Sequence, residues 1–230
     1  MLFAPFLFAY VLICLALLVA LLVLIEINLI SRVFMVLGLR PRGALLALLA
    51  SLLGSYVNIP LYTVKSGLVP IVATVNNFGV TYAIPLQFAG PSTIVAINVG
   101  GALVPILISI YALLRMPSAL LPSALGTAFV ALVTHQFAYP LRGVGIALPL
   151  FVAPLAAALV AIILGRTMRL SRGAHVVAYV SGVLGTLIGA DLTNLYRIAE
   201  LGAPVASIGG AGTFDGVFLT GIVAVLIAGL

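Results

Sequence analysis

The chain has 230 residues, of which 64% are hydrophobic and 6% charged, and its mean hydropathy is +1.40. A soluble domain of this size needs far more polar surface, so the composition indicates an α-helical membrane protein. The net charge is +6, but the basic residues are scattered and Trp is absent, which argues against nucleic acid as a partner. Cys14 is the only cysteine, so the sequence offers no internal disulfide and no cysteine-based metal site.

Apolar runs of about twenty residues recur between basic or Gly/Pro breaks, and each is long enough for one transmembrane helix. The first run lacks a basic n-region and a cleavage signal, so we expect a spanning helix there and no cleaved peptide. The predicted fold class is an all-α polytopic membrane protein with about seven transmembrane helices, forming a single integral membrane domain over 1–230. The expected spans are 3–30, 43–64, 93–114, 118–138, 144–165, 173–198 and 206–229.

The basic residues predict the orientation of the chain in a cell membrane. Cytoplasmic loops are enriched in Lys and Arg, and most basic residues follow the odd-numbered spans. We therefore expect the N-terminus outside and the C-terminus in the cytoplasm. The odd loops carry Arg32, Arg40, Arg42, Arg115, Arg166, Arg169 and Arg172, whereas the even loops carry Lys65, Arg142 and Arg197.

The segment between the second and third spans has a hairpin pattern. Two β-rich runs, 71–75 and 80–84, flank the turn Asn76-Asn77-Phe78-Gly79. We expect a small β-hairpin that lies at the membrane interface or packs over the helices. The functional alternative is a sheet edge that pairs with an extended substrate.

Short matches between the two halves of the chain predict an internal repeat. Arg42-Gly43-Ala44 corresponds to Arg172-Gly173-Ala174, and Val99-Gly100-Gly101-Ala102 resembles Ile208-Gly209-Gly210-Ala211. Spans one to three would then repeat as spans five to seven, in halves of about 1–115 and 140–230. Because one span separates the copies, the repeat would be parallel, related by an axis along the membrane normal.

Two of the four acidic residues, Asp191 and Asp215, lie in apolar, glycine-rich surroundings. Each is twelve residues from Ala203, within the turn Gly202-Ala203-Pro204. In a helical hairpin both carboxyls would lie about 18 Å from its tip, near the middle of an apolar core ~30 Å thick. Carboxylates inside a membrane are costly, so the pair indicates a functional site.

Two aspartates at one depth on adjacent helices are suited to share a proton. The ionised member then acts as general base toward water while the protonated one polarises a carbonyl. The structural alternative has Asp191 capped by Asn194 or Thr193, and Asp215 paired with Arg197 or capping a helix.

Five further residues are candidates for contact with a substrate. The glycines would give a substrate backbone access, or allow close helix packing. The asparagines would line a cavity, or cross-link helices by hydrogen bonds. The set is Gly210, Gly212, Asn194, Asn58 and Asn98.

Two resemblances follow from these motifs. Asp191-Leu-Thr-Asn-Leu-Tyr-Arg and Asp215-Gly-Val-Phe-Leu-Thr-Gly-Ile-Val are similar to the two active-site motifs of presenilin-type intramembrane proteases, although the residues before Asp215 are Gly212-Thr213-Phe214 where that family has G-x-G. Over the whole chain, the phrases Val57-Asn58-Ile59-Pro60, Asn98-Val99-Gly100-Gly101-Ala102 and Gly189-Ala190-Asp191-Leu192 resemble a prokaryotic multi-pass membrane family of unknown function.

The first resemblance implies an intramembrane aspartyl hydrolase in which Asp191 and Asp215 are catalytic, without cofactor or metal. The alternative is a small-solute or ion transporter or channel, with the aspartates binding a proton or cation. The expected partners are membrane lipid and either a membrane-embedded peptide or a small solute, and a homo-oligomer is left open.

Overall fold

The computed structural model describes residues 4–65, 68–77, 80–89, 92–141, 145–168, 173–200, 203–210 and 216–229. The chain divides into two compact units, Met1–Leu48 and Leu49–Leu230. The first unit contains α1 (Ala4–Val36) and the start of α2 (Pro41–Gly54). Its side chains over 11–26 are exposed although nearly all are apolar, as expected for a helix surrounded by hydrocarbon.

By length and composition, three helical stretches of the described residues can cross a membrane, which is consistent with a membrane location. They are Val11–Val36, Pro117–Phe137 and Ala174–Ile198. They correspond to the predicted first, fourth and sixth spans. The other apolar helices are shorter, and the single membrane domain and the internal repeat stay predictions.

The prediction of a mainly helical fold is confirmed, but three predicted spans each combine a helix with a strand. In span 43–64, α2 ends at Gly54 and β1 (Asn58–Lys65) follows. In span 93–114, β4 (Ser92–Asn98) leads through the π-helix η1 (Val99–Leu103) into α3 (Val104–Arg115). Span 206–229 divides into β7 (Val205–Ile208) and α7 (Gly216–Ala228). The described fold is therefore mostly helical with small sheets.

These three strands form one sheet in the order β1-β4-β7. β1 pairs antiparallel with β4, which places Asn58 opposite Asn98. β4 pairs parallel with β7, from Ile94 opposite Val205 to Ile97 opposite Ile208. The sheet thus joins segments more than one hundred residues apart in the sequence.

The predicted hairpin between the second and third spans is confirmed. β2 (Leu68–Asn77) pairs antiparallel with β3 (Val80–Ala89), and Asn77 faces Val80 across the turn. Its position at a membrane interface stays a prediction. A second hairpin, β5 (Tyr139–Leu141) with β6 (Gly145–Ala147), follows α4 (Leu120–Phe137) and was not predicted.

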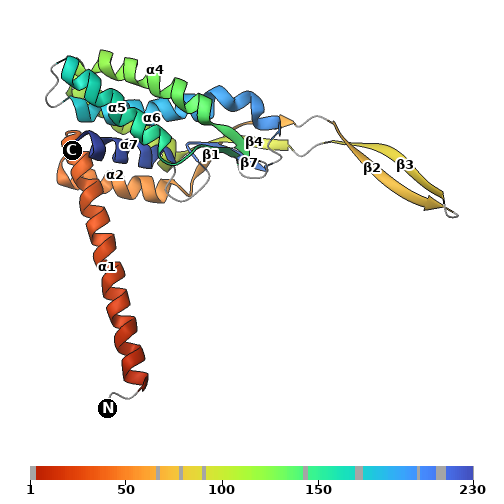
Figure 1. Ribbon diagram of the computed structural model, residues 1–230, viewed down its shortest axis with the longest axis horizontal. Coiled ribbons are helices and arrows are strands. Elements are labelled where there is room, and N and C mark those ends of the chain that lie inside the picture. The colour runs from red at the N-terminus through yellow and green to blue at the C-terminus, as the bar shows by residue number, and fades with distance from the viewer. Residues whose placement is uncertain are drawn as a thin grey trace. The chain divides into compact units, whose positions relative to one another are not determined.

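The helical part of the second unit packs around α6 (Ala174–Thr186), whose neighbours are α3, α4 (Leu120–Phe137), α5 (Val152–Thr167) and α7. In Figure 1, α4, α5, α6 and α7 run side by side, with β1, β4 and β7 at one end of them. Glycines allow this close packing: a Cβ on Gly185 would meet Val130 of α4, and one on Gly182 would meet Ala157 of α5.

The helices of this unit have two chemically different ends. Gly165 lies against Ala174 and Gly229 against His175, so α5 and α7 end where α6 begins. Arg166 is in the last turn of α5 at this end, which we call the basic end. The π-helix η3 (Leu187–Asp191), the 3₁₀ helix η4 (Leu192–Glu200) and the sheet form the opposite end, which we call the strand end.

Candidate functional site

Asp191 lies at the last residue of η3, where the α-helical geometry of α6 has already changed to a π-turn. Such π-turns within helices are frequent at functional sites. The side chain is half-buried, and its Oδ2 atom accepts a hydrogen bond of 2.8 Å from the backbone N–H of Gly209. Gly209 and Gly210 have φ values of +81° and +93°, which glycine adopts without strain. The turn after β7 therefore presents a backbone amide to the carboxylate.

The two neighbours that we expected to cap Asp191 bond elsewhere. Thr193 Oγ1 donates to the carbonyl of Gly189 at 2.7 Å, and Asn194 Nδ2 donates to the carbonyls of Ala190 and Gly189 at 3.0 and 3.2 Å. Asn194 is buried, with 1% of its surface exposed. Its amide therefore satisfies the carbonyls of its own helix, and the capping alternative for Asp191 is wrong.

Asn58 and Asn98, two predicted site residues, lie together across the sheet. Asn98 Nδ2 donates to Asn58 Oδ1 at 3.0 Å and to the carbonyl of Ser55 at 2.7 Å, while its Oδ1 accepts the N–H of Gly101 at 2.7 Å. Ser207 of β7 also donates to Asn58 Oδ1, at 2.6 Å. The two asparagines cross-link the sheet, and Asn98 also caps the start of η1.

These contacts form one chain of polar groups at the strand end. Ser207 binds Asn58 through its side chain, and two residues later Gly209 binds Asp191 through its backbone. Asn58 is exposed, Ser207 and Asp191 are half-exposed, and Asn98 is buried. The cluster therefore has a closed inner side at Asn98 and an open outer side from which water or a ligand can approach.

The predicted helical hairpin around Ala203 is wrong, because β7 occupies the start of its second arm. Ala203 and Pro204 instead join the sheet: the carbonyl of Ala203 accepts from Thr93 Oγ1 at 2.7 Å. Asp191 is seventeen residues after Ala174, about 26 Å along the helix at 1.5 Å per residue. It lies toward the strand end, not at mid-depth.

The remaining predicted residues stand as follows. Asp215 and Gly212 lie outside the described residues, so the distance between the two aspartates stays a prediction. Gly210 is described and closes the turn after β7, donating its N–H to the carbonyl of Ser207 at 3.2 Å. Asp215 is the residue directly before α7 and six residues after Gly209.

Sequence reasoning did not place two groups near the site. Ser207 was not singled out, although it is the one hydroxyl in the run Val205–Ile208. His135, at the end of α4, has Nδ1 2.8 Å from Thr193 Oγ1, which connects α4 to η4 just beyond Asp191. The described residues contain no group of three or more His, Cys, Asp or Glu that could hold a metal ion.

Comparison with known proteins places this chain in a family. The sequence profile of the family described as "Protein of unknown function (DUF1614)" matches residues 52–227. No curated protein and no solved structure matches the chain. The match covers the sheet, the helices α3 to α7 and Asp191. Because it spans most of the sequence, the chain belongs to the DUF1614 family.

Proposed function

We propose that the protein is an intramembrane aspartyl hydrolase that cleaves a membrane-embedded peptide, with Asp191 and Asp215 as its catalytic pair. The observation that carries the proposal is the hydrogen bond from Gly209 to Asp191. It brings the segment that leads to Asp215 to the first carboxylate. Six residues of chain reach at most about 21 Å, so the chain length allows Asp215 to approach the first carboxylate.

The arrangement around Asp191 suits general acid–base chemistry. The Asp191 residue is half-buried, and the N–H of Gly209 fixes the orientation of its Oδ2 atom. Asp215 would hold the proton that polarises the scissile carbonyl, and the ionised member would activate water. Gly210 would give the substrate backbone close access beside β7.

The position of Asp191 also gives water a route to the pair. We propose that the basic end faces the cytoplasm, because Arg166 ends α5 and Arg115 ends α3 there, and cytoplasmic loops are enriched in Lys and Arg. The N-terminus would be outside and the C-terminus inside. Asp191 would then lie near the outer edge of an apolar core ~30 Å thick, where water reaches more easily than at the midplane.

A second candidate function is transport of a small solute or cation. Its supporting observation is that α2, α3 and α7 adjoin strands of one sheet at the strand end, where Asn58, Asn98 and Ser207 contribute polar atoms. Interrupted helices beside polar groups are typical of transporter binding sites. Asp191 would then bind the proton or cation.

One preparation tests both candidates. The purified protein is reconstituted in liposomes with a fluorogenic transmembrane peptide, and cleavage is measured for the wild type, Asp191→Asn and Asp215→Asn. Asparagine keeps the shape and an acceptor for Gly209, so the fold is preserved while the acid and base are lost. Glu26→Gln is the matched control, because Glu26 is an exposed acid of α1 outside the site.

The hydrolase proposal expects cleavage by the wild type and Glu26→Gln, and a loss of at least about 10³-fold in each aspartate variant. Proton or cation flux that requires Asp191, in vesicles where the peptide stays intact, would instead establish transport. Cleavage that survives either aspartate substitution would refute the catalytic pair.

A further inference from the structure

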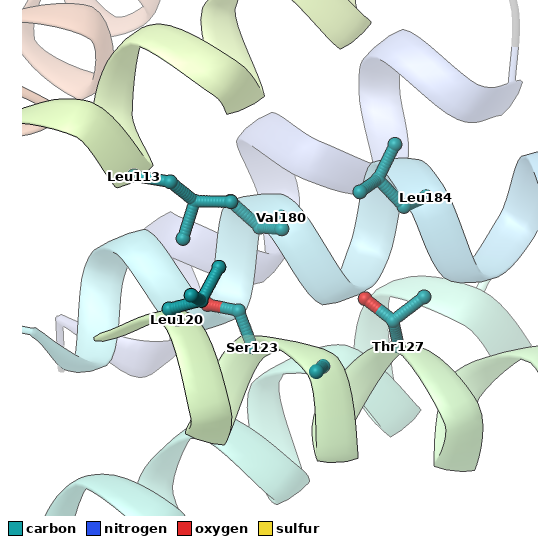
Figure 2. Close-up of a pocket in the computed structure, with 7 residues that line it drawn as sticks. Leu113, Leu120, Ser123, Thr127, Val180 and Leu184 are labelled. Carbon is teal, nitrogen blue, oxygen red and sulfur yellow. The ribbon is translucent and has the colours of Figure 1, made fainter. Parts of the chain in front are cut away.

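A cavity of about 310 Å³ lies between α3, α4 and α6, away from the Asp191 site. Figure 2 shows its lining residues, and most of them are apolar. The residues are Leu113, Leu120, Ser123, Ala124, Thr127, Val180 and Leu184. The volume is at the lower end of the range of small-molecule sites, which bind ligands mostly by apolar contact with a few polar groups.

Two hydroxyl groups in this cavity lack a hydrogen bond, as do the helical hydroxyls of Ser51 and Thr186 outside it. Ser123 Oγ and Thr127 Oγ1 are buried and have no hydrogen-bond partner among the described residues. Ser123 is 1% exposed. By contrast, six other hydroxyls bond to a carbonyl four residues earlier. They are those of Ser109, Thr134, Thr167, Ser181, Thr193 and Thr220.

The two free hydroxyls are positioned to act together. Ser123 and Thr127 are four residues apart on α4, so their Cβ atoms are about 5–6 Å apart on one face of the helix. In Figure 2 both side chains lie on the side of α4 that faces α6. A buried hydroxyl without a partner is costly, so a ligand that accepts two hydrogen bonds would compensate both groups.

The surface around the cavity indicates what can enter it. Leu120 and Ala124 line the cavity and are themselves exposed, so its opening lies on this side of α4. The neighbouring Leu121 and Leu125 are 63% and 49% exposed. An opening surrounded by exposed leucines faces hydrocarbon when the helix is in a bilayer. The occupant therefore comes from the lipid phase.

The depth of Ser123 is close to that of the ester region of a phospholipid, and Thr127 lies one helical turn, about 6 Å, deeper. Ser123 is six residues after Pro117, the first residue of the apolar helical stretch Pro117–Phe137, or about 9–10 Å along the helix. Arg115, exposed at the end of α3, marks the head-group level. The polar zone on each side of the apolar core is about 5–8 Å thick, so acyl ester carbonyls lie close to the level of Ser123.

We propose that this cavity binds an acyl chain of an ester-linked phospholipid, with Ser123 and Thr127 donating to its two ester carbonyls. The inference rests on the proposed membrane location and is independent of the hydrolase activity. The lipid would fill the space between α3, α4 and α6 and hold these helices together.

The test compares two lipids that differ only in the proposed acceptors. Native mass spectrometry of the detergent-purified protein measures binding of dioleoyl phosphatidylglycerol and of its diether analogue, which lacks both carbonyls. We expect the wild type to bind the diester about tenfold more tightly, because intramembrane hydrogen bonds contribute about 0.6 kcal/mol or more each. Equal binding of the two lipids by the wild type would overturn the proposal.

Substitutions locate the preference in the cavity. The double variant Ser123→Ala/Thr127→Val should bind both lipids equally, and Ala124→Trp should block the opening and weaken both. Ser109→Ala is the matched control, because Ser109 is a buried helical hydroxyl outside the lining. Asp191→Asn should keep the diester preference, which separates this inference from the hydrolase. A double variant that still prefers the diester would place the lipid elsewhere and refute the assignment.

Discussion

Asn98 connects β1, β4 and the start of η1, so its replacement by leucine is a strong test of the sheet. Leucine has the same number of side-chain heavy atoms and the same branching but leaves the carbonyl of Ser55 and the N–H of Gly101 without their bonds of 2.7 Å each. Asn58 Oδ1 keeps its bond from Ser207. Two unsatisfied buried groups cost about 1–3 kcal/mol each, so Asn98→Leu should destabilise the protein by about 2–6 kcal/mol.

Thermal unfolding of the purified protein in detergent measures this loss. For a chain of this size, about 2–6 kcal/mol corresponds to a Tm lower by about 4–24 °C. Asn28→Leu is the matched control, because Asn28 is exposed and makes one bond to the carbonyl of Leu24 in its own helix. A Tm for Asn98→Leu within about 2 °C of the control would refute the network as drawn.

Three further predictions concern close packing and the site. Gly189→Ala should destabilise by about 1–3 kcal/mol, since the new Cβ would collide with α4. Gly216→Ala should change stability by less than about 1 kcal/mol, because its Cβ would meet no other part of the described structure within 4 Å beyond its own helix and chain neighbours. Equal thermal shifts would contradict this. Gly209→Ala should lower both stability and peptide cleavage, because the φ of +81° is strained for alanine and the new Cβ would be too close to Ala102. Full activity of this variant would show that the turn is not needed. His135→Leu should lower the free energy of unfolding by less than about 1 kcal/mol in the same assay, because the hydrogen bond of His135 to Thr193 is exposed. A larger loss of stability would indicate a structural role for His135.

The hairpin β2–β3 could be predicted because its signal is local. Two β-rich runs flank an Asn-rich turn, and such turns determine the pairing by themselves. The first, fourth and sixth spans were also predictable, since each is a long apolar run. These features depend on neighbouring residues only.

The central sheet could not be predicted because its partners are distant in sequence. A run such as Val205–Ile208 is apolar and β-branched, and within a hydrophobic window it resembles the start of a helix. Its strand geometry comes from pairing with β4, more than one hundred residues earlier. Hydropathy reports burial and does not distinguish a buried strand from a buried helix.

The candidate site was predictable in part. Rare polar residues in apolar surroundings pointed to Asp191, Asn58 and Asn98, and the structure brings the two asparagines together. Their connection to Asp191 passes through Ser207 and the backbone of Gly209, and a backbone donor has no sequence signature. The bonds of Asn194 to the carbonyls of its own helix depend on the local turn geometry and were not predicted, and its role in substrate binding stays a prediction.

The central claim is that Asp191 and Asp215 act as one catalytic unit, and a double substitution tests it most directly. Cleavage of the membrane-embedded peptide is compared for Asp191→Asn, Asp215→Asn and the variant with both changes. Residues that act as a unit have strongly non-additive effects. We predict that the double variant is no slower than the slower single variant. Losses that multiply in the double variant would show that the two aspartates act independently and would contradict the proposed pair.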